Sequence, residues 1–451
     1  MKIEQFEDKG LAHYSYAILS ESDRQIVLID PSRDISQYLA YAENNEATII
    51  GVIETHPHAD FVSGHLELHQ IAGATIYCSA LVGAVYPHQT FDDGELIHFG
   101  KITLKALNTP GHSPDSISIV LMHDGIDKAV FTGDTLFIGD CGRPDLRERA
   151  GNLTAKREQL AGEMYYSLRD KLVMLNDDVI VYPAHGAGTL CGKALSEANS
   201  STIGDEKLSN WSLQNMTEAE FITTLLEDQP FVPKYFPFDV ELNKHGATNL
   251  AQAIANIPVG PTNHLNSSIH IIDTRAENEF KKGHLPGSIN LQNGGKFETW
   301  LGSIIAPEEA FYLVAENEEI LDSLILRCAK IGYEPFIERA FVFQAGSAIT
   351  DAMDTSTFSA NLTEYTIVDI RNKGEVKEHP IFAHAINIPL PELRERISEI
   401  PLDKPIVVHC AGGYRSAAGS SMINNAFADK TKVFDLGDNI KHFDKHEVTT
   451  H

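Results

Sequence analysis

Cysteine is scarce in this sequence, which limits what sulfur can do in the folded protein. The chain has five cysteines in 451 residues, and no two of them form a CxxC pair. They are Cys78, Cys141, Cys191, Cys328 and Cys410. An odd and scattered set of this kind argues against a disulfide framework. Any cysteine that matters is therefore expected to act as a free thiol.

Positive charge is also scarce. The chain has 36 Lys and Arg against 63 Asp and Glu, a net charge of −27. Such a surface repels phosphates and anionic lipids, so neither nucleic acid nor a membrane is expected as a partner. No apolar run is long enough to span a bilayer, and the first residues lack the charged and apolar segments of a signal peptide. We therefore predict a cytoplasmic protein.

The first 200 residues alternate between short apolar runs and helical stretches. One helical stretch, SGHLELHQIAG, ends at Gly73, a favourable helix C-cap. Apolar runs rich in β-branched residues predict buried strands at 25–30, 47–56, 102–112, 128–137 and 177–185. The last four carry a metal-binding side chain at or near their ends, namely His56, His112, Asp134 and His185. Because strand ends meet at one edge of a layered α/β sheet, these side chains are expected to converge.

The stretch ETHPHADFVSGH, residues 54–65, adds two donors at alternate positions. The full set is His56, His58, Asp60, His112, Asp134 and His185. It offers nitrogen and oxygen without sulfur, which suits iron, zinc or manganese. Spacing alone does not choose between His56 and His58 as a ligand. A polar turn would explain the run at 54–65, but it would not explain donors at four strand ends.

Several motifs that carry these donors resemble a known superfamily. THPHAD, TPGH, FTGD and YPAHG are similar to the glyoxalase II-like branch of the metallo-β-lactamase superfamily. GDCGRPDL, which follows Asp134 closely, narrows the resemblance to the persulfide dioxygenases. The resemblance implies an α/β fold, an αββα sandwich with the site at one edge.

The resemblance also assigns roles to the donors. It implies one Fe(II) per chain, held by His56, His112 and Asp134. It places His58, Asp60 and His185 around these ligands, where they orient ligands and substrate through hydrogen bonds. Arg143 is a candidate for site support or anion binding, and a structural salt bridge is an equal alternative. Cys141 and Cys191 are interpreted as packing thiols, and His65 as a surface or helix residue.

Phe61 stands where dinuclear members of the superfamily have a histidine for the second metal. Phenylalanine has no lone pair and excludes water from its side of the site. A second metal would be short of donors, so one metal is expected. Two histidines and one carboxylate with open positions are typical of non-haem Fe(II) oxygenases.

The second half of the chain contains a repeat. SSIHIIDTRAENEFKKGHLPGSINL at 267–291 matches EYTIVDIRNKGEVKEHPIFAHAINIPL at 364–390. Asp273, Arg275 and Glu279 align with Asp369, Arg371 and Glu375, 96 positions later. We interpret the repeats as two small α/β domains of one kind. The predicted domains span residues 1–250, 251–355 and 356–451.

A cysteine loop stands out in the second repeat. In KPIVVHCAGGYRS, a buried strand is followed by Cys410, and Arg415 lies five positions later. Ala411, Gly412, Gly413 and Tyr414 lie between them and are predicted to turn backbone N–H groups inward, above a helix N-terminus. Such surroundings, with Arg415 closing the ring, lower the pKa of a thiol and make it a nucleophile. A cysteine phosphatase loop has one more residue between Cys and Arg; this spacing resembles the rhodanese loop.

The first repeat has Ala315 where the second has Cys410, so we expect a Cys-less rhodanese-like domain followed by an active one. The whole chain resembles fused persulfide dioxygenase–sulfurtransferases. That implies Fe(II)-dependent oxidation of a low-molecular-weight thiol persulfide by O₂ to sulfite and thiol. Transfer of sulfane sulfur to sulfite would then give thiosulfate, in sulfide detoxification. We also expect a homo-oligomer. The alternatives are a glyoxalase II-type thioester hydrolase with an accessory rhodanese, and a persulfide relay or sensing module.

Overall fold

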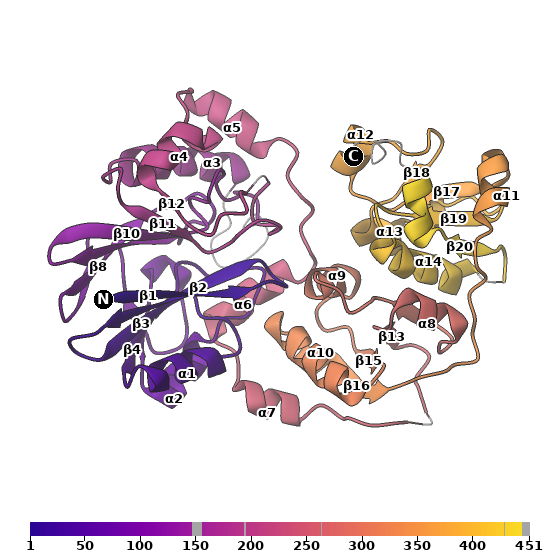
Figure 1. The fold of residues 1–451 in the computed structure, drawn as a ribbon, viewed down its shortest axis with the longest axis horizontal. Coiled ribbons are helices and arrows are strands. Elements are labelled where there is room, and N and C mark those ends of the chain that lie inside the picture. Colours follow the sequence, from indigo (N-terminus) through magenta and orange to yellow (C-terminus); the bar gives the residue numbers. More distant parts are fainter. Residues whose placement is uncertain (147–155, 194, 263, 428, 444–451) are drawn as a thin grey trace. The chain divides into compact units, whose positions relative to one another are not determined.

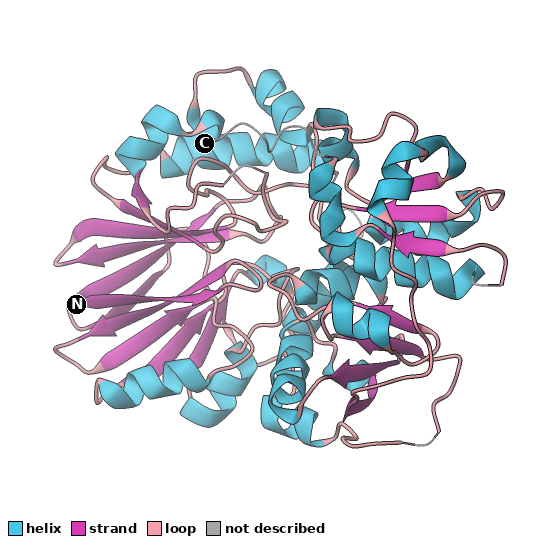
Figure 2. Ribbon diagram, turned by 45° about the vertical axis from the view of Figure 1, so that its right-hand side comes forward, coloured by secondary structure: helices cyan, strands magenta, loops and turns pink. Residues whose placement is uncertain are grey.

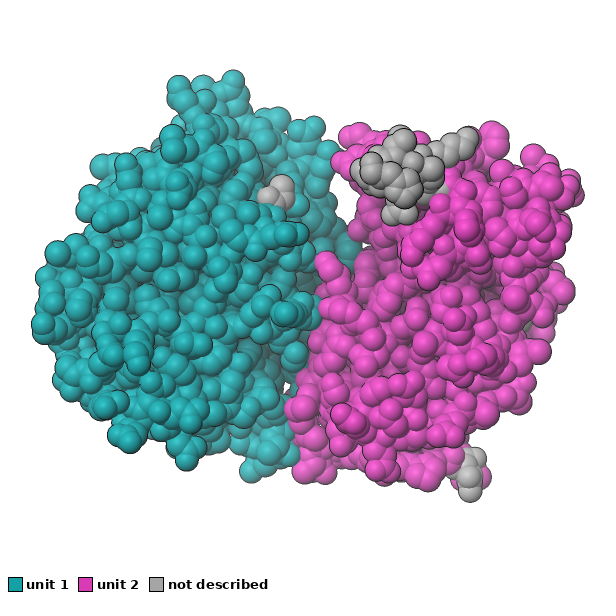
Figure 3. Space-filling model, in the orientation of Figure 1, with its two compact units in different colours: residues 1–253, 329–332 teal, residues 254–328, 333–451 magenta. Residues whose placement is uncertain are grey.

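Two six-stranded sheets dominate the first part of the chain in its computed structural model (Figure 1). The structure describes residues 1–146, 156–193, 195–262, 264–427 and 429–443. They form two compact units, coloured separately in Figure 3. Unit 1 comprises Met1–Ala253 with Ala329–Gly332, and unit 2 comprises Ile254–Cys328 with Tyr333–His451.

The first sheet of unit 1 follows chain order. It is antiparallel from β1 to β3 and parallel from β3 to β6. Its strands are β1 (Lys2–Asp8), β2 (His13–Ser20), β3 (Gln25–Ile29), β4 (Thr48–Ile53), β5 (Thr75–Cys78) and β6 (Gln89–Thr90). The second sheet has the order β12-β11-β10-β9-β8-β7. Its strands are β7 (Leu96–Phe99), β8 (Ile102–Asn108), β9 (Ile117–His123), β10 (Ile126–Gly133), β11 (Ile180–Pro183) and β12 (Ser201–Thr202).

Helices cover the outer face of each sheet, and Figure 2 shows the resulting layers. The helices of this part of the chain are α1 (Ser36–Asn44), α2 (His65–Ala72), α3 (Arg157–Tyr166), α4 (Ile203–Ser209), α5 (Glu218–Leu226), α6 (Phe236–His245) and α7 (Leu250–Ala255), of which α1 and α2 lie on the first sheet and α3 to α5 on the second. Ile18, Leu104 and Phe131 belong to the apolar core between the sheets. Tyr38 of α1 packs on the first sheet, and Phe221 of α5 packs on the second. These layers confirm the predicted αββα sandwich.

Unit 2 holds two four-stranded parallel sheets with the same strand order. The first has the order β14-β13-β15-β16, from β13 (His270–Asp273), β14 (Ser288–Asn290), β15 (Phe311–Ala315) and β16 (Ile337–Val342). The second has the order β18-β17-β19-β20, from β17 (Thr366–Asp369), β18 (Ile386–Asn387), β19 (Ile406–His409) and β20 (Val433–Asp435). The helices are α8 (Glu277–Lys282), α9 (Phe297–Ile304), α10 (Glu318–Lys330), α11 (Thr355–Ala360), α12 (Lys373–Glu378), α13 (Leu393–Arg396) and α14 (Tyr414–Phe427). The two predicted rhodanese-like α/β regions are therefore present.

Strand register shows that the two repeats correspond residue by residue at their centres. Asp273 lies opposite Val314, and Asp369 lies opposite His409. The residues after these partners are Ala315 and Cys410, so Ala315 does occupy the cysteine position of the first repeat. The domain boundaries themselves remain predictions.

Two local expectations can be compared with the structure directly. Gly73 ends α2 in the left-handed conformation, at φ 70°, as its C-cap position predicts. Among the helices of the described residues, none is both long and apolar enough to cross a membrane.

Candidate metal centre and cysteine loop

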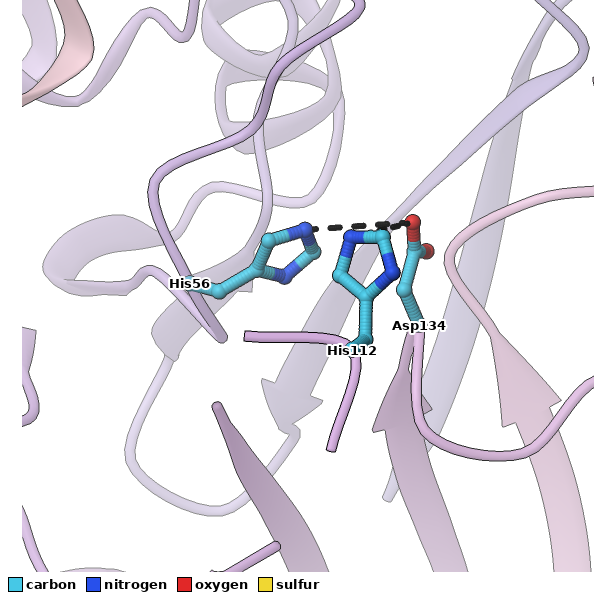
Figure 4. Close-up of side chains that lie close together, drawn as sticks. All are labelled: His56, His112 and Asp134. Carbon is cyan, nitrogen blue, oxygen red and sulfur yellow. Dashed lines mark ion pairs between the residues drawn. The ribbon is translucent and has the colours of Figure 1, made fainter. Parts of the chain in front are cut away.

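Three predicted metal ligands lie together at one edge of the sandwich, in loops that follow β4, β8 and β10. His56, His112 and Asp134 each offer one ligand atom, and these atoms lie within 4.8 Å of one another. The distances to Asp134 Oδ2 are 3.8 Å from His56 Nε2 and 3.5 Å from His112 Nε2 (Figure 4). All three side chains are buried. Convergence of the strand ends has thus brought these donors into one cluster.

The hydrogen bonds of this cluster leave its ligand atoms available to a metal. His112 Nδ1 lies 2.8 Å from the Arg143 carbonyl oxygen, so this nitrogen donates and Nε2 keeps its lone pair. Asp134 Oδ2 is buried and has no hydrogen-bond partner among the described residues. A buried oxygen in that state costs free energy unless a cation satisfies it. The donor set therefore fits a metal ion held by His56, His112 and Asp134.

The CGRP stretch supports the site through its backbone. A Cβ at Gly142 would lie 1.9 Å from the Asp134 carbonyl oxygen, so only glycine allows this close passage. Arg143 is buried, and its Nε and Nη2 donate to Asp145 at 2.7 Å each. Its Nη1 lies 3.1 Å from the Leu190 carbonyl oxygen. The guanidinium thus forms the structural salt bridge, and site support comes from the Arg143 carbonyl.

His185 connects two carboxylates. Its Nδ1 lies 2.7 Å from Asp134 Oδ1, and its Nε2 lies 2.8 Å from Asp60 Oδ2. Burial disfavours charge on this ring, but Asp134 and Asp60 together raise the pKa of His185 well above its ordinary value. Burial would raise the pKa of Asp134, yet His185 and His112 hold it well below its ordinary range. His185 and Asp60 therefore fix the orientation of the Asp134 carboxylate.

Sulfur does lie close to this site, contrary to the expectation from the motifs. The Cys191 sulfur joins Asp60 and His185 in a second buried group whose ligand atoms lie within 4.8 Å of one another. The loop after β11 returns to the site, and Arg143 N donates to the Cys191 carbonyl oxygen at 2.9 Å. Burial raises the pKa of the Cys191 thiol well above its ordinary value. These three residues could act as ligands of a second metal. The absence of a donor at Phe61 therefore does not by itself determine how many metal ions the site holds.

Phe61 packs between two imidazoles in the interior. Its ring centroid lies 3.8 Å from that of His13 and 4.3 Å from that of His58. The His13 ring centroid also lies 5.6 Å from that of His185. Sequence reasoning missed His13 because it stands alone at the start of β2, with no metal-binding motif around it.

The His58 ring lies beside that of His56, with centroids 4.2 Å apart, but its donor atom belongs to a different group, with Asp30 and Glu54. Its Nε2 lies 3.1 Å from Asp30 Oδ1 and 3.8 Å from Glu54 Oε2. Burial raises the pKa of Glu54 well above its ordinary value, and the charge of Asp30 adds to this effect. His65 begins α2, as a helix residue, but it is fully buried, with Nδ1 3.6 Å from Glu54 Oε1. The geometry therefore favours His56 over His58 as the ligand.

In the cysteine loop, one backbone N–H is directed at the sulfur of Cys410. Cys410 follows β19 directly, and the N–H of Gly413 donates to its sulfur at 3.2 Å. Gly413 has a φ of 89°, in the left-handed region that glycine adopts readily. Helix α14 begins at Tyr414, so its N-terminus lies beside the sulfur and favours a negative charge there. The loop thus has the features that stabilise a thiolate or a bound persulfide.

Arg415 is held by two neighbours that the sequence did not connect with it. Its Nη1 and Nη2 donate to the two Glu375 oxygens at 2.6 and 2.7 Å. Its guanidinium also lies 5.6 Å from the centroid of the Trp300 ring. The Tyr414 hydroxyl donates to the Gln292 carbonyl oxygen at 2.7 Å. Trp300 and Gln292 belong to the first repeat, which therefore has a structural part in the cysteine loop.

Comparisons with known proteins agree with this architecture. Residues 9–185 match the metallo-β-lactamase superfamily. Residues 262–325 and 354–444 match the rhodanese-like domain. A crystal structure of a metallo-β-lactamase from Staphylococcus aureus subsp. aureus COL is similar with a TM-score of 0.69 and 31% identity, covering 76% of this chain and 99% of that one.

Two curated relatives of similar identity have names that indicate different activities. A probable hydroxyacylglutathione hydrolase of Schizosaccharomyces pombe is 32% identical over 178 residues, 38% of this chain and 63% of the relative. The mitochondrial persulfide dioxygenase ETHE1 of Bos taurus is 31% identical over 182 residues, 40% of this chain and 66% of the relative. The chain spans less than two thirds of the length of either relative. Their sequence identities to this chain are nearly equal, so they do not distinguish the hydrolase from the dioxygenase. It belongs to the metallo-β-lactamase superfamily, with rhodanese-like domains fused to the metallo-β-lactamase domain.

Proposed function

We propose that the chain is an Fe(II)-dependent persulfide dioxygenase joined to a sulfurtransferase. It oxidises a low-molecular-weight thiol persulfide to sulfite and then transfers sulfane sulfur to that sulfite. The observation that carries the proposal is the buried cluster of His56, His112 and Asp134, in which two imidazoles and one carboxylate converge. Such a triad leaves coordination positions open and is typical of non-haem Fe(II) oxygenases.

The protein's own groups would prepare this site for an anionic sulfur substrate. Iron, when bound by the three ligands, would supply the chemistry that brings O₂ and a persulfide together. His185 holds Asp134 in place from one side, and the Arg143 carbonyl holds His112 from the other. Phe61, nearly inaccessible to solvent, excludes water from the side on which a dinuclear hydrolase would have its second metal.

The first reaction balances with O₂ as the oxidant. The outer sulfur of R–S–S⁻ receives two oxygen atoms from O₂ and one from water, and the sulfur–sulfur bond breaks. The products are R–SH, sulfite and one proton. The outer sulfur is oxidised while O₂ is reduced, so no further reductant is required.

The second reaction uses Cys410. Its thiolate attacks the outer sulfur of a second persulfide, the sulfur–sulfur bond breaks and the thiol leaves. Sulfite then attacks the sulfur carried by Cys410, which forms thiosulfate and returns the thiolate. The Gly413 N–H, 3.2 Å from the Cys410 sulfur, stabilises the thiolate that attacks and the thiolate that leaves when thiosulfate forms. Fusion of the two domains raises the local concentration of sulfite for this step.

The principal alternative is a thioester hydrolase of the glyoxalase II type. Curated relatives of similar identity include such enzymes, and the group of Asp60, His185 and Cys191 could hold a second metal. That reaction activates water and needs no O₂. Consumption of O₂ therefore distinguishes the two functions.

The test is O₂ uptake by protein purified and loaded with Fe(II) without air. Glutathione persulfide is one suitable substrate, and a glutathione thioester is the matched substrate for the alternative. We expect O₂ uptake on the persulfide, and none with protein loaded with zinc instead. Thioester hydrolysis with two metals bound, and no O₂ uptake in the iron-loaded protein, would establish the hydrolase. Metal loading must be controlled because sites of this kind bind zinc more tightly than iron.

A further inference from the structure

His409 is a buried histidine that the proposed chemistry does not yet use. It is the last residue of β19 and directly precedes Cys410, and its side chain is fully buried. Its Nδ1 lies 3.4 Å from the Cys410 carbonyl oxygen. One edge of the ring meets Phe382, with ring centroids 5.1 Å apart and planes at 78°.

The first repeat provides an internal comparison for this position. Asp273 and Arg275 form the same ion pair there as Asp369 and Arg371 form in the second repeat, with Nη2 to Oδ2 at 2.6 Å in both. Val314 occupies the position of His409 and is also fully buried. Valine therefore satisfies the fold at this position, while an imidazole must be desolvated. The histidine occurs in the repeat that has the cysteine.

The groups around the His409 ring show which of its two nitrogens donates a hydrogen bond. Asp369 Oδ2 lies 3.5 Å from His409 Nε2, but this nitrogen has no hydrogen-bond partner among the described residues. The Asp369 oxygens instead accept from Nε and Nη2 of Arg371, at 2.6 to 3.1 Å. Nδ1 is the nitrogen that meets the hydrogen-bond geometry, and its acceptor is the Cys410 carbonyl oxygen. Burial lowers the pKa of His409, so the ring is neutral near neutral pH and has one proton to donate.

We propose that His409 is a positioning residue of the sulfurtransferase site, which holds the Cys410 carbonyl and thereby orients the first amide of the cysteine loop. A trans peptide is planar, with its C=O and N–H pointing in opposite directions. A carbonyl drawn toward His409 turns the Ala411 N–H the other way. The side chains of successive residues in an extended backbone point to opposite faces, so the Cys410 side chain lies on the face opposite to His409. The Ala411 N–H, turned away from His409, therefore faces the Cys410 sulfur. The inference rests on the proposed sulfur transfer at Cys410.

The test compares His409→Val with His409→Asn in the full chain. Valine copies Val314 of the first repeat and has no donor, whereas the asparagine amide places a donor close to the position of His Nδ1. Ile367→Val, a small change in the buried part of neighbouring β17, is the matched packing control. The readouts are thiosulfate formation from persulfide and sulfite, and the pH dependence of Cys410 alkylation by iodoacetamide, followed by peptide mass spectrometry.

Loss of one hydrogen bond corresponds to a loss of about two- to tenfold in kcat. We expect that loss in His409→Val, with an unchanged KM for sulfite and Cys410 alkylation shifted to higher pH. His409→Asn should stay close to the parent protein in both readouts, and so should Ile367→Val. The proposal is overturned if His409→Val alkylates with the parental pH profile, or if His409→Asn is as slow as His409→Val. If the valine variant does not fold, the test rests on His409→Asn, whose thiosulfate formation and Cys410 alkylation should both match those of the parent protein. Sulfur transfer that survives in Cys410→Ser would instead refute the proposed function.

Discussion

Replacing Arg415 by alanine should impair sulfur transfer by more than the loss of one positive charge. Both Glu375 oxygens accept from the Arg415 guanidinium, at 2.6 and 2.7 Å. Burial would raise the pKa of Glu375, but Arg415 holds it below its ordinary value, so this carboxylate is ionised. Arg415→Ala therefore removes a cation from the cysteine loop and leaves beside it a carboxylate that has lost its ion pair, although the Asn372 N–H still donates to it at 3.0 Å.

The magnitude follows from these two effects. Loss of the electrostatic attraction between the Arg415 guanidinium and the sulfur anion costs about 1.5–3 kcal/mol. Repulsion by the remaining carboxylate adds roughly 1–2 kcal/mol at an effective dielectric constant near 20, discounted because Glu375 is partly exposed. At about 1.4 kcal/mol per tenfold change, Arg415→Ala should lower the rate of sulfur transfer by roughly 60- to 4,000-fold.

A second substitution separates the two effects. Arg415→Ala combined with Glu375→Gln removes the repulsion but does not restore the cation. The double variant should therefore be about five- to thirtyfold faster than Arg415→Ala alone. Glu375→Gln alone should retain most activity, because its amide oxygen can still accept from Arg415. The assay is thiosulfate:cyanide sulfurtransferase activity at saturating and subsaturating thiosulfate. A double variant no faster than Arg415→Ala would refute the reasoning, because Glu375 would then have no electrostatic effect on Cys410.

Three further predictions concern the metal centre and stability. His112→Ala should lose iron and O₂ uptake, while thiosulfate:cyanide transfer at Cys410 continues; metal analysis and both assays on one preparation check this, and parallel loss of both activities would contradict it. Phe61→His should increase metal content toward two per chain, because Asp60, His185 and Cys191 already lie within 4.8 Å of one another; an unchanged single metal in the folded variant would show that another feature decides the count. Burial would raise the pKa of Glu309, but its hydrogen bonds from Arg394 bring it from 4.5 to about 2. A lowered carboxylate pKa stabilises the fold above about pH 4.5, and this contribution is lost as the pH falls toward about 2. Glu309→Gln should therefore lower the free energy of unfolding by about 1–2 kcal/mol near pH 7, with a smaller difference near pH 3; urea unfolding at both values measures it, and a difference independent of pH would contradict the assignment.

Much of the layout was predictable because it depends on local patterns. β-branched apolar runs predicted the strands that end near His56, His112 and Asp134, and the layered fold required those ends to meet. The glycines and spacing of the cysteine loop predicted an N–H directed at Cys410, which Gly413 supplies. The repeat predicted that Ala315 lies at the cysteine position, because two copies of one fold share a register.

The remaining features arise from contacts between segments that are distant in the sequence. Cys191 reaches Asp60 only because the loop after β11 returns to the site, and nothing near Cys191 indicates that return. His13 stacks on Phe61 from the start of β2, with no motif around it. Glu375 could be aligned with Glu279 through the repeat, but Glu279 pairs with exposed Lys282 whereas Glu375 binds Arg415. Alignment therefore showed an equivalent position without showing its partner.

The most direct test of the central claim is the ratio of O₂ consumed to sulfite formed by Fe(II)-loaded Cys410→Ser. This variant keeps the metal domain unchanged and cannot carry sulfur on residue 410, so sulfite should accumulate instead of thiosulfate. An O₂ electrode and chromatographic sulfite analysis on the same sample, corrected for spontaneous oxidation of the persulfide, give the ratio. Our account predicts one O₂ consumed for each sulfite formed. Persulfide turnover without O₂ consumption, or thiosulfate formed at the parental rate, would contradict it.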